Sequence, residues 1–246
     1  MDGAFSVAEL PASRGAAWLA DAFQLFRRQP LGWIGLCVGW LTIWFGLLML
    51  PLLGPVLANL LQPAFFASFA IAAFKQSAGE RVTMGDLFSG FRRNIRALVN
   101  LGLIMMLAQL ASVFLMKALG LPGWPADKAF DLVEYAELLR ESTWIVASGF
   151  LVMAIASGAL WFAPQLIVFH DMTTSHAIRW SVYAALANIG PMILYGALLL
   201  VLLVIAWIPL GMGLLVMLPV MVISTFTGYR EVFEAKAMKP VSDTPS

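Results

Sequence analysis

The sequence predicts an all-α, polytopic transmembrane bundle of six spans, and two properties of the chain support this class. Charged residues make up 12% of the 246 residues and hydrophobic residues 61%, whereas a soluble domain carries about 25% charged residues. Four apolar intervals hold no charge; they separate Arg28 from Lys75, Arg96 from Lys117, Glu141 from Asp171, and Arg179 from Arg230. A spanning helix needs roughly 20 apolar residues, so the first and last intervals each have room for a hairpin of two spans.

The six spans are expected at residues 31–50, 54–74, 97–117, 144–168, 190–208 and 211–229. Pro51 with Gly54, and Pro209 with Gly211, lie midway along the two long intervals. Proline and glycine favour the tight turns that a hairpin needs. A single membrane domain then covers 1–239, with an outer loop at 118–143 that carries a short amphipathic helix, and residues 240–246 form a disordered tail.

The distribution of basic residues predicts the side of the membrane that each loop occupies, because cytoplasmic loops are enriched in lysine and arginine. With a cytoplasmic N-terminus, only Lys117, Lys128 and Arg140 of the 15 lysines and arginines fall outside. We therefore expect a multi-pass protein of a bacterial inner membrane with its N- and C-termini in the cytoplasm. Trp33 and Trp180 are expected near the inner surface, where tryptophan forms interfacial belts.

Three segments on the cytoplasmic side are predicted to form amphipathic helices, each leading into a span. The first, 13–28, has an apolar face made of Trp18, Leu19, Ala22, Phe23 and Phe26. The second begins at Thr83, has Asp86 at capping-box spacing, and aligns Met84, Leu87, Phe88 and Phe91. The third begins at Thr173 or Thr174 and aligns Ile178, Val182, Ala185, Leu186 and Ile189.

The ends of these segments indicate a repeated unit. Phe26-Arg-Arg-Gln29 closely matches Phe91-Arg-Arg-Asn94, and the third segment ends at Asn188, just before Gly190-Pro191. One interpretation is that an interfacial helix followed by two spans occurs three times. The alternative is that any polytopic protein needs basic, amphipathic inner loops, so that their similarity reflects location alone.

Several classes of function are disfavoured by the sequence. All 14 acidic residues fall outside the expected spans, whereas an ion-coupled transporter usually keeps a carboxylate in the membrane. The net charge of +1 gives no basis for binding nucleic acid. The single cysteine, Cys37, excludes an intramolecular disulfide, and two histidines with one acid are too few for a catalytic metal site. Because no catalytic motif occurs either, we expect no enzyme, no metal and no cofactor.

Two hypotheses for function remain, and each has its own candidate residues. The first is a non-enzymatic membrane component that binds a membrane-protein partner or the anionic head groups of the lipid bilayer. Its basic residues, each worth about 1 kcal/mol at an anionic surface, are Arg27, Arg28, Arg92 and Arg93. The alternative is a passive or facilitated carrier of a small amphiphile, with a polar cavity lined by Asn59, Gln62, Gln109, Gln165 and His170. The plainer interpretation of these amides is that they hydrogen-bond neighbouring helices.

The chain also resembles an uncharacterised proteobacterial family of six-span inner-membrane proteins. The residues that carry the resemblance are Trp18, Phe26-Arg-Arg-Gln-Pro30, Leu50-Pro-Leu-Leu-Gly54, Trp161-Phe-Ala-Pro164, Phe169-His170, Ala177, Ser181, Asn188, Tyr195-Gly196, Ile208-Pro-Leu-Gly211, Pro219 and Tyr229-Arg-Glu-Val-Phe233. The chain looks distantly similar to membrane domains that accompany glycerophosphodiester phosphodiesterases, although phosphodiesterase residues are absent from it. The resemblance implies fold and location, and it implies no activity.

Overall fold

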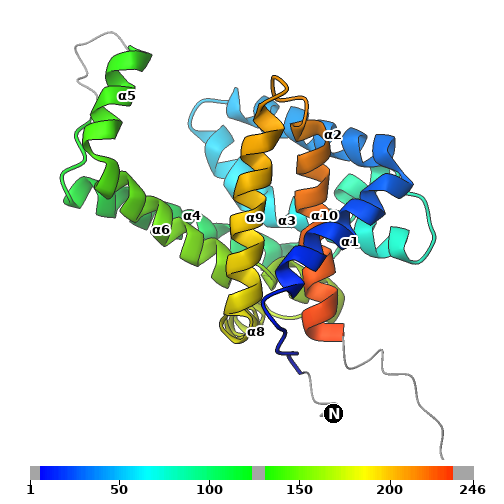
Figure 1. Ribbon diagram of the computed structural model, residues 1–246. Helices are drawn as coiled ribbons and strands as arrows, with labels where there is room; N and C mark the ends of the chain where they lie inside the picture. The colour runs from blue at the N-terminus through cyan, green and yellow to red at the C-terminus, as the bar shows by residue number, and fades with distance from the viewer. Residues whose placement is uncertain (1–5, 124–130, 235–246) are drawn as a thin grey trace, which may run out of the picture.

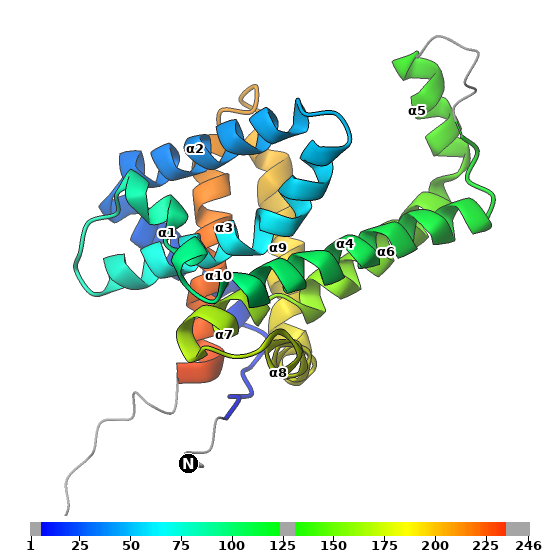
Figure 2. The ribbon, with the colours of Figure 1, turned by 180° about the vertical axis from the view of Figure 1, so that it is seen from behind.

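Figures 1 and 2 show the computed structural model of the chain, which describes residues 6–123 and 131–234. In these two stretches the regular secondary structure is helical throughout: α1 (Arg14–Arg28), α2 (Pro30–Leu48), α3 (Leu53–Ser77), the 3₁₀ helices η1 (Met84–Phe88) and η2 (Gly90–Arg92), α4 (Ile95–Ala118), α5 (Leu132–Glu141), α6 (Thr143–Ala159), α7 (Ala163–His170), α8 (Thr174–Ala187), α9 (Ile189–Trp207) and α10 (Leu214–Glu234). Six helical stretches are long and apolar enough to cross a membrane, which confirms the predicted fold class. The expected tail at 240–246 and residues 124–130 of the outer loop lie outside the described residues.

Proline and glycine explain where several helices end. Pro30 is the first residue of α2, and a residue before proline is pushed out of helical geometry, so α1 ends at Arg28. In the turn between α2 and α3, a Cβ on Gly54 would lie 1.9 Å from the carbonyl oxygen of Leu47, so only glycine allows the hairpin to close this tightly. Pro164 stands near the start of α7 and separates it from α6.

Two helices differ from what the sequence predicts. The second amphipathic segment forms the short helices η1 and η2 instead of one α-helix, because Gly85 and Gly90 weaken an α-helix there. Helix α10 continues past residue 229 to Glu234. Glu231, expected outside the spans, therefore lies in the last turns of α10, where its carboxylate pairs with Arg14 and accepts a hydrogen bond from Trp18 Nε1 at 2.8 Å.

Helices α3 and α10 form the centre of the molecule. Within their apolar windows 56% and 67% of the residues are buried, against 17–22% in the other four spans. The outer spans expose large apolar side chains, including Phe114, Phe150 and Leu200, and such surfaces suit a lipid environment. Trp33 is fully buried, and its Nε1 donates to Gln76 Oε1 at 2.9 Å. The expectation that Trp33 lies in an interfacial belt is therefore wrong.

The helices follow one another as three similarly ordered units. The first unit contains α1, α2 and α3; the second contains η1, η2, α4, α6 and α7; the third contains α8, α9 and α10. Each amphipathic segment packs against the hairpin of the preceding unit: η1 and η2 against α2 and α3, and α8 against α6 and α7. The series closes on itself, because α1 packs against α9 and α10 of the last unit.

One amide side chain per unit joins it to the next, and we call these three residues the junction amides: Gln29, Asn94 and Asn188. Gln29 donates to the carbonyl oxygen of Val82 at 2.7 Å and accepts from its N–H at 2.9 Å. Asn94 Nδ2 donates to Asp171 Oδ1 at 3.0 Å, just before α8. Asn188 accepts from the N–H of Leu10 at 3.0 Å and donates to the carbonyl oxygen of Ala8 at 3.0 Å, just before α1. The three junction amides occupy corresponding places in the units.

The hairpin tips lie on one side of the molecule. In both views the turn between α2 and α3, the turn between α9 and α10, and helix α5 lie in the upper half, and α7 and α8 lie in the lower half (Figures 1 and 2). The α4–α6 hairpin projects from the rest and carries α5 at its tip. The two described chain ends meet, because Ala8 N–H donates to the carbonyl oxygen of Val232 at 2.8 Å. We call the end of the molecule that carries α1, η1, η2 and α8 the base.

Candidate functional site

The arginine pairs predicted from the sequence lie exposed on the base. Arg27 and Arg28 end α1, Arg92 ends η2 and Arg93 follows it; all four side chains are exposed. In the first two units the pair immediately precedes a junction amide, so the two pairs occupy corresponding positions. The guanidinium of Arg27 lies 5.9 Å from the centre of the Phe23 ring, which directs an aromatic face and a cation to the same exposed side of α1.

Two hollows with arginine in their walls adjoin Arg28 of the first pair. One of about 170 Å³ lies between α1, α3 and α10, and it is lined by Asp21, Gln24, Leu25, Arg28, Ser77 and Arg230. Another of about 390 Å³ is lined by Arg28, Gln29, Gln76, Gly79, Glu80 and Arg81. Guanidinium groups match the oxygens of phosphate and carboxylate, but each hollow also has a carboxylate in its wall, Asp21 in the smaller and Glu80 in the larger. Arg28 belongs to both.

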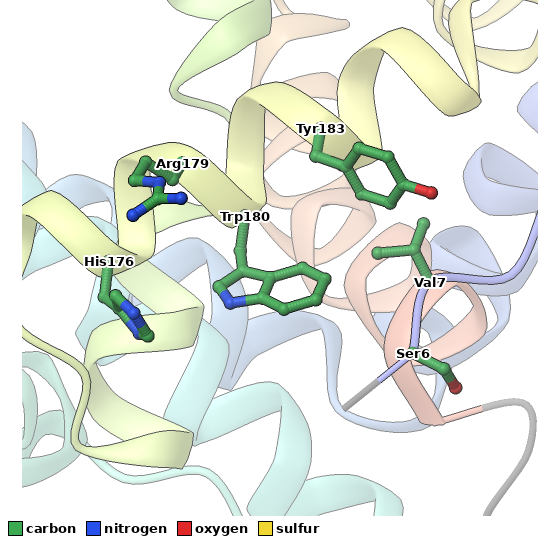
Figure 3. Close-up of a pocket in the computed structure, with 6 residues that line it drawn as sticks. All are labelled: Ser6, Val7, His176, Arg179, Trp180 and Tyr183. Carbon is green, nitrogen blue, oxygen red and sulfur yellow. The ribbon is translucent and has the colours of Figure 1, made fainter. Parts of the chain in front are cut away.

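A larger pocket of about 560 Å³ lies on α8 (Figure 3). It is lined by Ser6, Val7, His176, Arg179, Trp180 and Tyr183. The four α8 side chains lie on one face of the helix, and Tyr183 points toward Val7 of the N-terminal segment. Trp180 and Tyr183 lie eight and five residues before the junction amide Asn188. Asp21 and Gln24 lie eight and five residues before the junction amide Gln29. The α8 pocket and the small hollow on α1 thus use corresponding helix positions, one with aromatic side chains and one with polar side chains.

The amides predicted to line a polar cavity lie on different helices, and among the described residues they do not line one common cavity. Asn59 donates to the carbonyl oxygen of Pro55 in its own helix at 2.8 Å. Gln62 is half-buried on α3, and Gln109 is exposed on α4. Gln165 is 1% exposed; its amide donates to the carbonyl oxygens of Trp161 and Phe162 and accepts from Thr225 Oγ1 at 3.1 Å. The hollows described above are lined by other residues.

His170 lies at the end of α7 and contacts α10. Its Nε2 lies 2.6 Å from the hydroxyl of Tyr229, and the neighbouring Phe169 ring stacks on Tyr229 with 5.3 Å between ring centres. Tyr229 is fully buried. The pair therefore joins two spans at their ends. Among the described residues, no group of three or more histidine, cysteine, aspartate or glutamate side chains is arranged to hold a metal ion.

Two features of the base were not predicted from the sequence. The hydrogen bonds of the junction amides join residues far apart along the chain, although the recurring amide after each amphipathic segment was a usable signal. The α8 pocket was also missed, because Ser6 and Val7 meet α8 only in the folded chain. Trp180 was expected near the inner surface, and nothing in the spacing of Arg179 and Trp180 indicated a pocket.

Comparison with known proteins adds one relative. Over 217 residues the chain is 30% identical to a probable inner membrane protein of Burkholderia thailandensis, and the match covers 83% of this chain and 76% of the relative. No protein-family model and no solved structure matches the chain. The relative supports the resemblance to inner-membrane proteins. The distant similarity to phosphodiesterase-associated membrane domains stays a prediction.

Proposed function

Because the chain belongs to the family of this inner membrane protein and is a multi-pass inner-membrane protein, we propose that it is a non-enzymatic membrane component whose base binds anionic lipid head groups. A membrane-protein partner with an acidic surface is the other ligand that the base would suit. Both ligands would meet the same exposed guanidinium groups.

One observation carries the proposal: the two arginine pairs are exposed at corresponding places on the base. Among the described residues, the ion pairs join Arg14 to Glu231 and Lys75 to Asp86, and neither of them involves the arginine pairs. A guanidinium without a carboxylate is available to phosphate oxygens. Each cation near an anionic leaflet contributes about 1 kcal/mol, so two pairs give a preference for anionic lipid.

The proposal includes an orientation in which the base faces the cytoplasm. Arginine and lysine concentrate in the segments that form the base, whereas Lys117 and Arg140 belong to the helices near the tip of the α4–α6 hairpin. The positive-inside rule assigns the basic side to the cytoplasm. Both chain termini would then be cytoplasmic, next to the anionic inner leaflet.

Lipid retention tests the proposal. The full chain is purified from vesicles of equal parts phosphatidylglycerol and phosphatidylcholine with matched acyl chains, and the retained lipids are counted by native mass spectrometry. We expect enrichment of phosphatidylglycerol, and we expect Arg27→Glu/Arg28→Glu combined with Arg92→Glu/Arg93→Glu to lower it severalfold. Equal retention by the wild type and the fourfold variant would contradict the role of the pairs.

The alternative carrier function has its own variant in the same design. Asn59, Gln62 and Gln109 are replaced together by leucine, which leaves intact the arginine pairs and the buried, hydrogen-bonded amide of Gln165. The proposal expects unchanged lipid enrichment and unchanged complementation of a deletion phenotype. A loss of complementation with the leucine variant, together with a silent arginine variant, would favour the carrier.

A further inference from the structure

Helix α8 presents three distinct faces. The face toward the bundle carries small buried residues, Ala177, Ser181 and Ala184, with Asn188 following the helix. A second face carries the apolar stripe predicted from the sequence, and its members Leu186 and Ile189 are 66% and 57% exposed. The third face carries the pocket residues His176, Arg179, Trp180 and Tyr183. The other members of the stripe are half-buried, and Ile178 packs against the core. The end of the stripe at Leu186 and Ile189 therefore faces the surroundings of the helix.

Helical spacing places the charge of the pocket beside this stripe. Residues three, four and seven apart share a side of an α-helix, so Arg179 neighbours Val182 and Leu186 on the stripe and His176 and Tyr183 in the pocket. Among the residues that the structure describes, no carboxylate pairs with Arg179. A cation, two aromatic rings and an exposed apolar stripe thus meet along one edge of α8.

The N-terminal segment completes the pocket. Ser6 and Val7 form the wall opposite α8 (Figure 3), and Asn188 fixes this segment through Ala8 and Leu10 at 3.0 Å each. The Trp180 ring lies between His176 on one side and Tyr183 and Val7 on the other (Figure 3). The pocket is therefore charged at one end and mostly apolar at the other.

We propose that the α8 pocket binds the phosphate head group of one anionic phospholipid. The Arg179 guanidinium takes the phosphate oxygens, for which its planar fork is suited. Trp180 and Tyr183 cover the glycerol region, as amphipathic rings do at membrane interfaces, and the acyl chains follow Leu186 and Ile189. A soluble phosphate ester would bury nothing on this stripe, which is why the structure favours a lipid. This assignment rests on the proposed preference of the base for anionic lipid.

Native mass spectrometry with defined lipid tests the site. The full chain in detergent is titrated with phosphatidylglycerol or with phosphatidylcholine of the same chain length. We expect one phosphatidylglycerol to stay bound where phosphatidylcholine is lost, and Arg179→Gln to weaken this binding about tenfold, the effect of losing one charge-assisted contact. Arg140→Gln, the same change on α5, should leave it unchanged, and Arg179→Lys should restore part of it.

Two further arms locate the lipid and identify its source. Phosphatidylglycerol with a photoreactive acyl chain should label the segment that contains Leu186 and Ile189, and Trp180→Leu should reduce this labelling. Displacement of the bound lipid by an equal concentration of glycerol 3-phosphate would overturn the lipid assignment in favour of a soluble ester. The thermal unfolding midpoint of each variant shows that it is folded.

The outcomes separate this site from the function on which it rests. If the wild type shows no preference for phosphatidylglycerol, the proposed function itself fails. A second outcome is that the wild type prefers phosphatidylglycerol, the four-arginine reversal removes this preference, and Arg179→Gln leaves it unchanged. In that case the general function stands and the α8 site is overturned.

Discussion

The carboxamide of Asn188 accepts a hydrogen bond at 3.0 Å from the backbone N–H of Leu10, which joins the end of α8 to the segment that precedes α1. The same side chain donates to the carbonyl oxygen of Ala8. Gln29 and Asn94 make the corresponding contacts at the other two boundaries between units. At those two boundaries the polypeptide chain itself also connects one unit to the next. At the boundary of Asn188 the two units are connected by contacts alone. This amide therefore helps to close the ring of units, together with contacts such as that of Ala8 with Val232.

Replacing Asn188 by leucine is therefore expected to destabilise the protein. Asn188 is fully buried, and the substitution leaves the N–H of Leu10 and the carbonyl oxygen of Ala8 without their partner. Both backbone groups are only partly buried, so losing the two hydrogen bonds should cost about 1–3 kcal/mol. The free energy of unfolding in detergent, followed by tryptophan fluorescence, measures this loss.

The control for this experiment is Asn59→Leu on α3. Asn59 bonds only to the carbonyl oxygen of Pro55 in its own helix, so its loss should change the free energy of unfolding by less than about 1 kcal/mol. Equal effects of the two substitutions would show that Asn188 has no special part in closing the ring.

Close approach of α1 to α9 gives a second prediction. A Cβ on Gly15 would lie 2.2 Å from the carbonyl oxygen of Pro191, whereas a Cβ on Gly46 would have no neighbour within 4 Å. Gly15→Ala must push the helices apart and should cost about 1–3 kcal/mol. Gly46→Ala should be neutral or stabilise α2 by up to about 1 kcal/mol. Gly15→Ala is expected to lower the thermal unfolding midpoint, and Gly46→Ala to leave it unchanged or raise it. A stabilised Gly15→Ala variant would contradict the packing of α1 on α9.

The fold class could be predicted because it depends on solvent. Charged groups are excluded from the hydrocarbon region whatever the tertiary contacts are, so the apolar intervals alone indicated the six spans. Tertiary contacts decide finer features, and tryptophan illustrates this. Trp33 and Trp180 have the same preference for interfaces, but Gln76 of α3 accepts a hydrogen bond from Trp33 and allows it to be buried. Gln76 lies far from Trp33 in the sequence, and the periodicity of the sequence gives no indication of this contact.

Only part of the candidate site could be predicted from the sequence, because the rest depends on tertiary contacts. The arginine pairs were found because they adjoin a repeated sequence and stay exposed. The α8 pocket depends on Ser6 and Val7, which only the closed ring of units brings to Trp180 and Tyr183. The amphipathic stripe of α8 was visible in the sequence, but its direction was not, because small residues such as Ala177 and Ala184 form the buried face.

Asp86 gives a prediction about pH. Burial alone would raise the pKa of its carboxyl, but hydrogen bonds from Thr83 and Lys75 outweigh burial and hold the pKa below its usual value. Thr83 N–H donates to Asp86 Oδ2 at 2.6 Å, and Lys75 Nζ lies 3.1 Å from Oδ1. The unfolded chain therefore takes up a proton first as pH falls, with a pKa of about 3.9.

Asp86 accordingly stabilises the folded state above about pH 4, and this contribution is lost as pH falls through the lower pKa of the folded protein. Asp86→Asn lacks the charge at every pH. The difference between the unfolding midpoints of wild type and Asp86→Asn should be constant from pH 6 to 8 and should narrow below about pH 4. A difference that widens in acid would contradict the depressed pKa.

The proposed orientation leads to a prediction that needs no ligand. Cys37 is 3% exposed, and Cys37→Ala gives a background free of thiols. Glu80 is exposed in the loop at the base, and Glu137 is exposed on α5 at the hairpin tip. If the base is cytoplasmic, a membrane-impermeant maleimide should label Glu137→Cys in intact spheroplasts and should label Glu80→Cys only after lysis.

The reverse pattern would place the base outside and remove the anionic inner leaflet as its ligand. Equal labelling of both positions in intact spheroplasts would contradict the six-span arrangement. In that arrangement α4 crosses the membrane between the two positions and places them on opposite sides.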